Sequence, residues 1–338
     1  MKLIKTTDAV GHVLCHDMTQ IIPGEYKGTR FCKGHVVTEE DIPILLSMGK
    51  ENLYIFETDE SMLHENDAAE ILCKICKGEN VDRGEVKEGK IELTAAIDGL
   101  FTVDREKLNA VNSIEELMIA TRKGDTAVKK GDKLAGTRVI PLVIEKEKLD
   151  RATAITASAP ILHVLPYTLQ TAAIITTGSE VFHGRIEDKF TPVLVEKLRA
   201  YGVTVTEHLT ADDGVDNIAN AVNSVKGKAD MILCTGGMSV DPDDNTPGAI
   251  RQSGANIVTY GAPVLPGAMF LLGYFDDGTP IMGLPGCVMY AKATIFDLVL
   301  PRIAAGMKLG KADFVMYGEG GLCLGCEKCT YPHCPFGK

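Results

Sequence analysis

The sequence predicts an α/β domain between residues 165 and 305, in which a mostly parallel sheet carries helices on both faces. Three observations lead to this fold class. Short apolar runs alternate with longer segments whose apolar residues recur at helical spacing. Three of the apolar runs end in turns that contain glycine. A smaller β-rich α+β domain is expected over residues 1–164, and a cysteine-rich tail over residues 306–338.

The elements expected in the first 164 residues follow from caps, turns and alternation. Thr38 suits the N-cap of a helix that ends at Gly49. Ser113 and Glu116 have the spacing of a capping box. The Asp98-Gly99 pair is typical of a two-residue hairpin turn. These patterns predict helices at 38–49, 67–77 and 113–122, strands at 53–56, 91–97, 100–103 and 139–144, and an interdomain link that begins at 146–151.

The second half shows the alternation of strands and helices that a parallel sheet requires. The helix expected over residues 190–201 has one apolar face and ends at Gly202. Thr246 and Pro247 suit the N-cap and the first position of a short helix over residues 247–252. The remaining predictions are helices at 215–225 and 290–304 and strands at 172–176, 203–206, 231–234, 257–260, 270–272 and 281–282.

The composition excludes several classes of function. A formal net charge of −11, 6% aromatic residues and no Trp argue against a nucleic-acid-binding surface. No apolar stretch reaches the length of a membrane span, and the first residues do not resemble a secretory signal. We therefore expect a cytoplasmic protein with neither a nucleic-acid nor a membrane partner.

The three glycine-containing turns form the first candidate site. Each follows a predicted strand, and the carboxyl ends of parallel strands meet at one edge of a sheet. Glycine lets the backbone adopt a positive φ and approach a ligand closely. One such turn is more often structural, but three in one domain favour a cradle for phosphate or a pterin. The residues of this cradle are Thr177, Gly178, Ser179, Glu180, Gly236, Gly237, Ser239, Pro285 and Gly286.

Acidic residues follow the same strands. Carboxylates beside a phosphate repel it unless a hard cation such as Mg²⁺ lies between them. For each single Asp the alternative is a solvated loop. Asp244 is a candidate for contact with a metal or ligand, because it lies between the second glycine turn and a helix start. The acidic residues are Asp188, Asp212, Asp213, Asp241, Asp243 and Asp244.

These blocks, in this order and spacing, resemble the molybdopterin-binding domain. That domain is shared by molybdopterin molybdenumtransferases, molybdopterin adenylyltransferases and competence-damage-inducible proteins. The resemblance covers about 140 residues, and residues 34–49 resemble a further stretch of the transferases. The matching motifs are Gly178-Ser179-Glu180, Asp188, Gly236-Gly237-Met238-Ser239-Val240-Asp241-Pro242-Asp243-Asp244, Pro266-Gly267 and Gly283-Leu284-Pro285-Gly286.

The resemblance implies roles for these residues. The first turn would line the pterin site, the second would cradle the ligand, and Pro285-Gly286 would complete the wall. Asp188 and Asp244 would be the catalytic residues, as acidic groups near the phosphate or metal. The family implies Mg²⁺-dependent chemistry on a phosphorylated pterin, which is either adenylylation or hydrolysis of the adenylylated form during molybdate insertion.

The sequence also departs from the transferase pattern. Lys189-Phe190 stands where the transferases carry Ser-Asn, and Cys287-Val288 replaces Asn-Pro. Leu265 and Ala268 stand where they carry lysines, and the loss of such cations would weaken charge stabilisation. Lys189, Arg185 and Lys292 are the candidates to compensate.

Three functions therefore stay open. The first is a transferase-like enzyme of molybdenum-cofactor biosynthesis. The second is a non-catalytic carrier or sensor of molybdopterin. The third is a nucleotide pyrophosphatase, suggested by Asp243-Asp244-Asn245-Thr246, which resembles a motif of the competence-damage-inducible proteins. The expected partners are a phosphorylated pterin, molybdoenzymes and a second copy of the chain, since related transferases dimerise.

A cysteine cluster is the second candidate site. The spacing is Cys323-x2-Cys326-x2-Cys329-x4-Cys334-Pro335. In a cytosolic chain such a cluster indicates metal before disulfides. An iron–sulfur cluster is favoured over zinc, although ferredoxin motifs have x3 before the fourth cysteine. Disulfides or free thiols are the remaining alternative. The other close pair, Cys73 and Cys76, is predicted to be buried on a helix.

Overall fold

The computed structural model describes residues 2–55, 61–242 and 244–338, so Phe56 and Asp243 lie outside the described residues. The chain divides into two compact units. The first unit comprises Met1–Ala96, Val103–Arg122 and Gly131–His163. The second unit comprises Ile97–Thr102, Lys123–Lys130 and Val164–Lys338. No helix in the described ranges has the length and hydropathy of a membrane span.

The first unit is a mixed α+β structure with a four-stranded antiparallel sheet in the order β6-β7-β11-β9. Three strand pairs, β1-β4, β2-β3 and β12-β5, complete its β structure. The strands are β1 Lys2–Lys5, β2 Met18–Ile22, β3 Tyr26–Phe31, β4 Asn52–Ile55, β5 Met62–His64, β6 Val81–Arg83, β7 Lys90–Ala95, β9 Leu117–Thr121, β11 Lys133–Val139 and β12 Val143–Glu145. The helices are η1 Thr6–Asp8, α1 Asp41–Ser47, α2 Glu65–Cys76, α3 Arg105–Asn112 and α4 Lys146–Ile155. Cys73 and Cys76 are buried on α2, as predicted.

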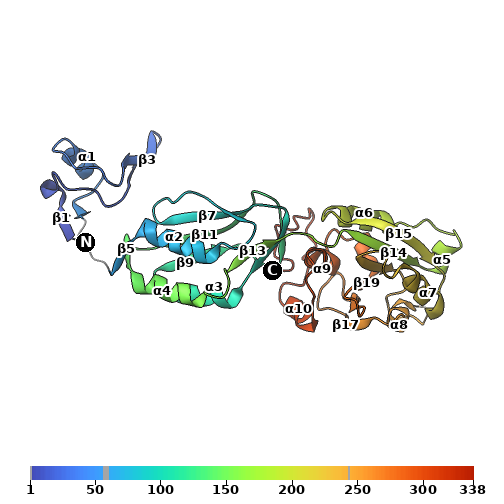
Figure 1. The fold of residues 1–338 in the computed structure, drawn as a ribbon. Coiled ribbons are helices and arrows are strands. Elements are labelled where there is room, and N and C mark those ends of the chain that lie inside the picture. The colour runs from blue at the N-terminus through green and yellow to red at the C-terminus, as the bar shows by residue number, and fades with distance from the viewer. Residues whose placement is uncertain (1, 56–60, 243) are drawn as a thin grey trace. The chain divides into compact units, whose positions relative to one another are not determined.

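The second unit is built on a six-stranded sheet in the order β15-β14-β16-β19-β18-β17 (Figure 1). The four strands β15, β14, β16 and β19 pair in parallel, while β18 is antiparallel to both of its neighbours. The strands are β14 Thr171–Thr177, β15 Thr204–Ala211, β16 Met231–Thr235, β17 Asn256–Tyr260, β18 Leu271–Tyr274 and β19 Pro280–Leu284. The helices are α5 Ser179–Phe182, α6 Phe190–Arg199, α7 Val215–Val225, α8 Thr246–Gln252, η2 Gly286–Met289, α9 Ile295–Ala304, α10 Lys311–Val315 and η3 Met316–Gly318.

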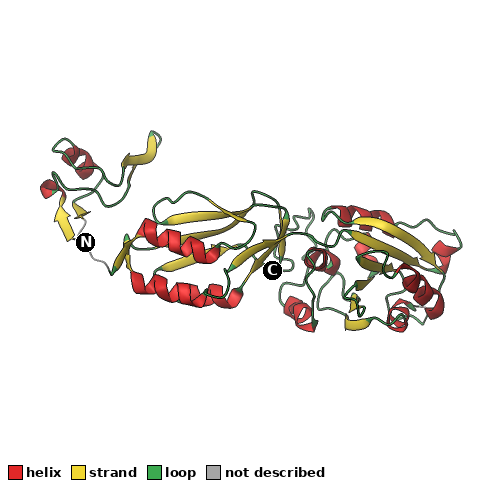
Figure 2. Cartoon of the chain, in the orientation of Figure 1, coloured by secondary structure: helices red, strands yellow, loops and turns green. Residues whose placement is uncertain are grey.

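Two hydrophobic cores cover the two faces of this sheet. Ala172 and Ile174 of β14 pack in one core with residues of α6 and α9. Ala173 and Ile175 pack in the other core with residues of α7 and α8. Because successive strand residues point to opposite faces, a strand buried on both faces must be apolar throughout. The predicted α/β class with helices on both faces is confirmed, and Figure 2 shows the alternation of strands and helices.

The predicted hairpin at Asp98-Gly99 is wrong. β7 belongs to the four-stranded sheet, whereas β8 Gly99–Val103 lies in a separate sheet in the order β10-β8-β13, with β10 at Thr126–Val128 and β13 at Leu162–Leu165. Asp98 and Gly99 make other contacts instead. The Asp98 carboxylate accepts bonds from the Lys130 amide (2.8 Å) and from Lys129 Nζ (2.9 Å). Gly99 lacks the Cβ that would overlap the Leu165 carbonyl oxygen.

Three further predictions in the chain need correction. Residues 113–122 are not a helix, because Leu117 and Ile119 are buried in alternation with exposed neighbours and form strand β9. The helix lies earlier, as α3, where the Asp104 side chain accepts the Lys107 amide. The segment 146–151 is not a link but the start of α4, whose charged residues form its exposed face. The last helix begins at Ile295 and not at residue 290, because Thr294 caps it there.

Candidate functional site

Three loops lie at the carboxyl edge of three neighbouring strands of the second unit. We call residues 177–180, 235–239 and 284–286 the rim loops, and each begins at the last residue of its strand, β14, β16 or β19. These strands are adjacent in the sheet and pair in parallel. Thr235 is the register partner of both Thr176 and Leu284, so the three loops begin at the same level. The structure therefore brings the three sequence turns together at one edge, as the topology of a parallel sheet requires.

Buried hydroxyl groups fasten the first two rim loops to the start of α8. The Thr177 hydroxyl donates to the Thr235 carbonyl (2.9 Å) and lies 3.2 Å from the Thr246 hydroxyl. The Thr246 hydroxyl in turn donates to the Gly236 carbonyl (2.8 Å). Thr177 and Thr246 are both buried, so these bonds are shielded from water. Thr246 was predicted as the helix N-cap, but it is the first helical residue, and Asn245 is the N-cap.

Glycine is required at the two central positions of the second rim loop. Gly236 has φ +86°, and a Cβ there would lie 2.5 Å from the Thr177 carbonyl oxygen. Gly237 has φ +53°, and its Cβ would lie 3.0 Å from the Thr246 hydroxyl and 3.6 Å from Cα of Asp244. Both glycines thus combine a left-handed backbone with close packing against the neighbouring loop.

Asp244 lies half-buried beside the second rim loop. Its amide donates to the Asp241 carbonyl (3.0 Å), and its carboxylate accepts no hydrogen bond from any residue in the described ranges. Tyr260 of β17 holds the same loop, since its hydroxyl donates to the Met238 carbonyl (2.9 Å). Burial and the nearby Asp244 carboxylate raise the pKa of Tyr260, so its hydroxyl keeps its proton.

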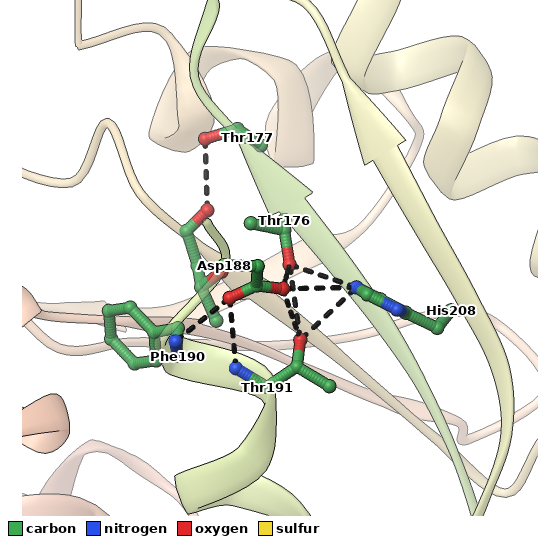
Figure 3. Close-up of polar contacts among 7 residues, drawn as sticks. Thr176, Thr177, Asp188, Phe190, Thr191 and His208 are labelled. Atoms are coloured by element: carbon green, nitrogen blue, oxygen red, sulfur yellow. Dashed lines mark hydrogen bonds and ion pairs between the residues drawn. The ribbon is translucent and has the colours of Figure 1, made fainter. Parts of the chain in front are cut away.

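Asp188 sits in a different environment, at the start of α6 (Figure 3). One carboxylate oxygen accepts the amides of Phe190 (2.8 Å) and Thr191 (3.1 Å). The other accepts the hydroxyls of Thr176 (2.9 Å) and Thr191 (2.6 Å) and lies 3.3 Å from Nε2 of His208. Burial alone would raise the pKa of Asp188, but these hydrogen bonds outweigh it and hold the pKa below its usual value.

Asp188 therefore joins three elements at the rim, because its partners come from β14, α6 and β15. The sequence pointed to Asp188 but not to Thr191 or His208. The polar residues at every second position from 204 to 210 were a usable sequence signal, since they extend the strand to His208, and this strand pairs with β14.

The remaining residues of the first and third rim loops differ in exposure. The Ser179 amide donates to one oxygen of the Asp213 carboxylate (2.9 Å), which holds the first rim loop to the segment after β15. Gly178 is buried and Glu180 is exposed. Pro285 is buried and Gly286 is exposed at the end of β19. The amides of Gly237, Ser239 and Gly286 donate to no acceptor in the described part of the chain.

The predicted compensating cations are exposed at three separate positions. Arg185 and Lys189 lie in the segment between α5 and α6, and Lys292 lies between η2 and α9. The Arg185 amide donates to the Glu180 carbonyl (2.8 Å), which holds this segment to the first rim loop.

The tail cysteines lie outside the rim loops. Cys323 and Cys334 are half-buried, Cys326 and Cys329 are exposed, and all four are free thiols. They line one cavity of about 310 Å³. Within residues 2–55, 61–242 and 244–338, no three His, Cys, Asp or Glu side chains are gathered closely enough to hold a metal ion.

Comparison with protein families assigns two segments of the chain. Residues 173–305 match a family described as a probable molybdopterin binding domain. That range contains all three rim loops, Asp188 and Asp244, and it ends before the tail cysteines. Residues 3–57 match a family described as a domain of unknown function.

Similar individual proteins cover only parts of the chain. A CinA-like protein of Desulfosudis oleivorans is 37% identical over 82 residues, which are 24% of this chain and 20% of that protein. A molybdopterin molybdenumtransferase of Staphylococcus aureus is 24% identical over 220 residues, 63% of this chain and 49% of that protein. The chain thus spans a fifth to a half of the length of these relatives.

Among solved structures, a molybdopterin biosynthesis protein of Pyrococcus horikosii is 14% identical, with a TM-score of 0.34. The similarity covers 72% of this chain and 79% of that one. The family match and the order of the motifs agree on the same segment of the second unit. Residues 173–305 therefore belong to the molybdopterin-binding domain family.

Proposed function

We propose that the rim loops bind molybdopterin or its adenylylated form, and that the protein acts in molybdenum-cofactor biosynthesis. One observation carries the proposal: adjacent parallel strands present, at one edge, the amides of Gly237, Ser239 and Gly286, which no described residue accepts. Backbone amides at such an edge suit an anionic ligand, even in a chain with a net charge of −11. The family of residues 173–305 supports a pterin as that ligand.

Asp244 is the carboxylate that best suits a Mg²⁺ ion at the rim. Its oxygens accept no hydrogen bond from the described residues, whereas both oxygens of Asp188 and one oxygen of Asp213 are already engaged. Hard cations take carboxylate oxygens as ligands. A bound Mg²⁺ would offset the negative charge of the ligand's phosphate. The donor set of Asp244 therefore fits this ion.

Asp188 and Asp244 were both expected to be catalytic, and the contacts suggest different contributions. Asp244 would act at the ligand. Asp188 is a positioning residue in this proposal, because its four hydrogen bonds hold β14 against the start of α6. The protein would supply its product to molybdoenzymes. We also propose a homodimer, which the mass of the purified protein in solution tests.

The proposal is tested by binding and turnover with the same ligands. The full chain is titrated with molybdopterin and with adenylylated molybdopterin, and hydrolysis of the latter is then measured with molybdate and Mg²⁺. Asp244→Asn should still bind but should lose turnover at least about 100-fold, equivalent to ~3 kcal/mol of barrier. Asp277→Asn, on the exposed turn between β18 and β19, is the matched control and should behave as wild type. Failure of both pterins to bind contradicts the proposal.

A second function, a non-catalytic carrier, is favoured by one observation. Leu265 and Ala268 occupy positions where the transferase pattern has lysines, and 57% of Leu265 is exposed. Binding of the pterin without turnover under any tested condition would select the carrier. Turnover of ADP-ribose in a parallel assay would select the pyrophosphatase alternative instead.

A further inference from the structure

The tail that follows η3 folds into a closed loop on the second unit. The Gly337 amide donates to the Gly320 carbonyl (2.8 Å), which joins the two ends of the loop. Phe336 is buried in the core on the α6 and α9 face of the sheet. Tyr331 packs edge-on against Phe336, with ring centroids 6.2 Å apart, and donates to the Asp297 carbonyl (3.0 Å). The loop between residues 320 and 337 is thus anchored at both ends and at its middle.

A second anchor ties the tail to the segment that precedes Pro266. The Leu265 amide donates to the Gly321 carbonyl (2.8 Å), and the Cys323 amide donates to the Leu265 carbonyl (2.8 Å). These two bonds form a parallel bridge between Leu265 and Leu322. The bridge fixes the position of Cys323, the first of the four cysteines, relative to the molybdopterin-binding domain.

The anchored loop borders a cavity of about 310 Å³ that all four cysteines line. Most other lining residues are apolar, among them Leu322, Pro335 and Phe336. Among the described residues that line the cavity, Lys292 is the one with a positively charged side chain. The volume is well above the ~30 Å³ that one water molecule occupies in the liquid, so there is room for more than a single ion.

We infer that this cavity holds an iron–sulfur cluster bound by Cys323, Cys326, Cys329 and Cys334. Four thiolates are the usual ligands of such clusters, and most of the other residues that line the cavity are apolar. A cluster with four thiolates is anionic, and Lys292 supplies a positive charge at the wall of the cavity. In the described ranges the four thiols are not gathered closely enough to hold a metal ion, so cluster assembly must bring their sulfur atoms together. The volume favours a cluster over a single zinc ion. The cysteine spacing does so too, because zinc sites typically have two Cys pairs separated by a longer spacer.

The test uses the full chain, purified without oxygen and reconstituted with ferric iron, sulfide and a thiol that reduces part of the iron. We expect iron and acid-labile sulfide in nearly equal amounts, together with a brown visible absorbance that dithionite bleaches. The double substitution Cys326→Ser and Cys329→Ser should remove at least nine-tenths of the iron and of the absorbance. Both of these thiols are exposed, so the fold should persist, and far-UV circular dichroism checks this.

Cys32→Ser is the matched control, because Cys32 is another exposed free thiol but does not line the cavity. It should retain the cluster in full. The inference is overturned if the protein binds zinc without sulfide, if the four tail cysteines form disulfides and no metal binds, or if Cys32→Ser loses the absorbance equally. None of these measurements needs a pterin, so their outcome is independent of the proposed function.

Discussion

At the scale of single residues, the rim depends on positions whose surroundings select one type of residue. Gly236 is the sharpest case, since it combines a φ of +86° with a carbonyl oxygen where a Cβ would lie. Asp188 is the second, since both oxygens of its carboxylate are engaged by the chain around it. The sequence identified both residues, but only their neighbours explain why another residue would fail.

Gly236→Ala should destabilise the second unit and weaken ligand binding. The left-handed backbone alone costs about 1–3 kcal/mol for a residue with a Cβ. The overlap with the Thr177 carbonyl adds displacement of the loop, so pterin affinity should fall at least about tenfold. Urea unfolding and ligand titration measure the two effects.

Gly278→Ala is the control for this substitution. Gly278 has a similar φ of +89°, but a Cβ there would meet nothing within 4 Å. It should show the backbone cost without the loss of affinity. Equal losses of affinity in both variants would show that close packing at Gly236 is not what shapes the rim.

Asp188→Asn should remove part of the pH dependence of stability. The pKa of Asp188 is lower in the folded chain than the value of about 3.9 in an unfolded chain. Its stabilising contribution is therefore complete above that value and is lost as the pH falls through the folded pKa. The variant should lose about 1–2 kcal/mol at pH 7 and show a shallower decline in acid. Urea unfolding between pH 3 and pH 7 measures the difference in free energy of unfolding between the variant and wild type.

A double-mutant cycle of Asp188→Asn and Thr191→Val isolates the hydrogen bond between these two side chains. The Thr191 hydroxyl donates to Asp188 over 2.6 Å, so the two substitutions should be less than additive in the free energy of unfolding. Full additivity would mean that the Figure 3 network does not act as a unit in solution.

At the scale of elements, local patterns were sufficient where an element is buried in a regular way. The apolar runs of β14 and β16 and the amphipathic spacing of α7 gave the correct strands and helix. Local patterns were misleading at residues 113–122. There a capping-box spacing predicted a helix, although the same segment has the two-residue period of strand β9. Cap residues occur in turns of several kinds, whereas burial with a fixed period reports the element directly.

The start of α9 is an element boundary that a substitution can test. The Thr294 hydroxyl accepts the Phe296 amide (3.2 Å), and Asp297 accepts the Thr294 amide (2.8 Å), so the two residues form a capping box. Thr294→Ala should lower the free energy of unfolding by about 0.5–2 kcal/mol. Thr294→Ser keeps the hydroxyl and should retain most of the stability. Urea unfolding compares them, and equal losses in both would exclude the cap as the cause.

At the scale of the whole molecule, the two units have separate roles in the proposal. All three rim loops lie in the second unit, and residues 3–57 in the first unit match a different family. A ligand that binds the rim only when it is folded will, by mass action, stabilise the second unit, which contains the rim.

Hydrogen exchange should locate this effect on the chain. With a saturating pterin, the amides of Gly237, Ser239 and Gly286 should exchange at least about tenfold more slowly, in line with a coupling of ~1.4 kcal/mol. Amides of α2 and β11 in the first unit should exchange as before. Exchange mass spectrometry measures both sets in one experiment, and slowing confined to the first unit would place the ligand elsewhere.

By itself, the sequence determined the α/β class, the strands that form the centre of the second sheet and the glycines that end them. These follow from local periods, and a parallel arrangement then places the ends of neighbouring strands at one edge. Three features required the tertiary structure: β7 and β8 belong to different sheets, His208 reaches Asp188, and the four tail cysteines line one cavity. The reason is physical: pairing and enclosure depend on contacts between residues far apart in the chain, and no local pattern records which distant partner will be chosen.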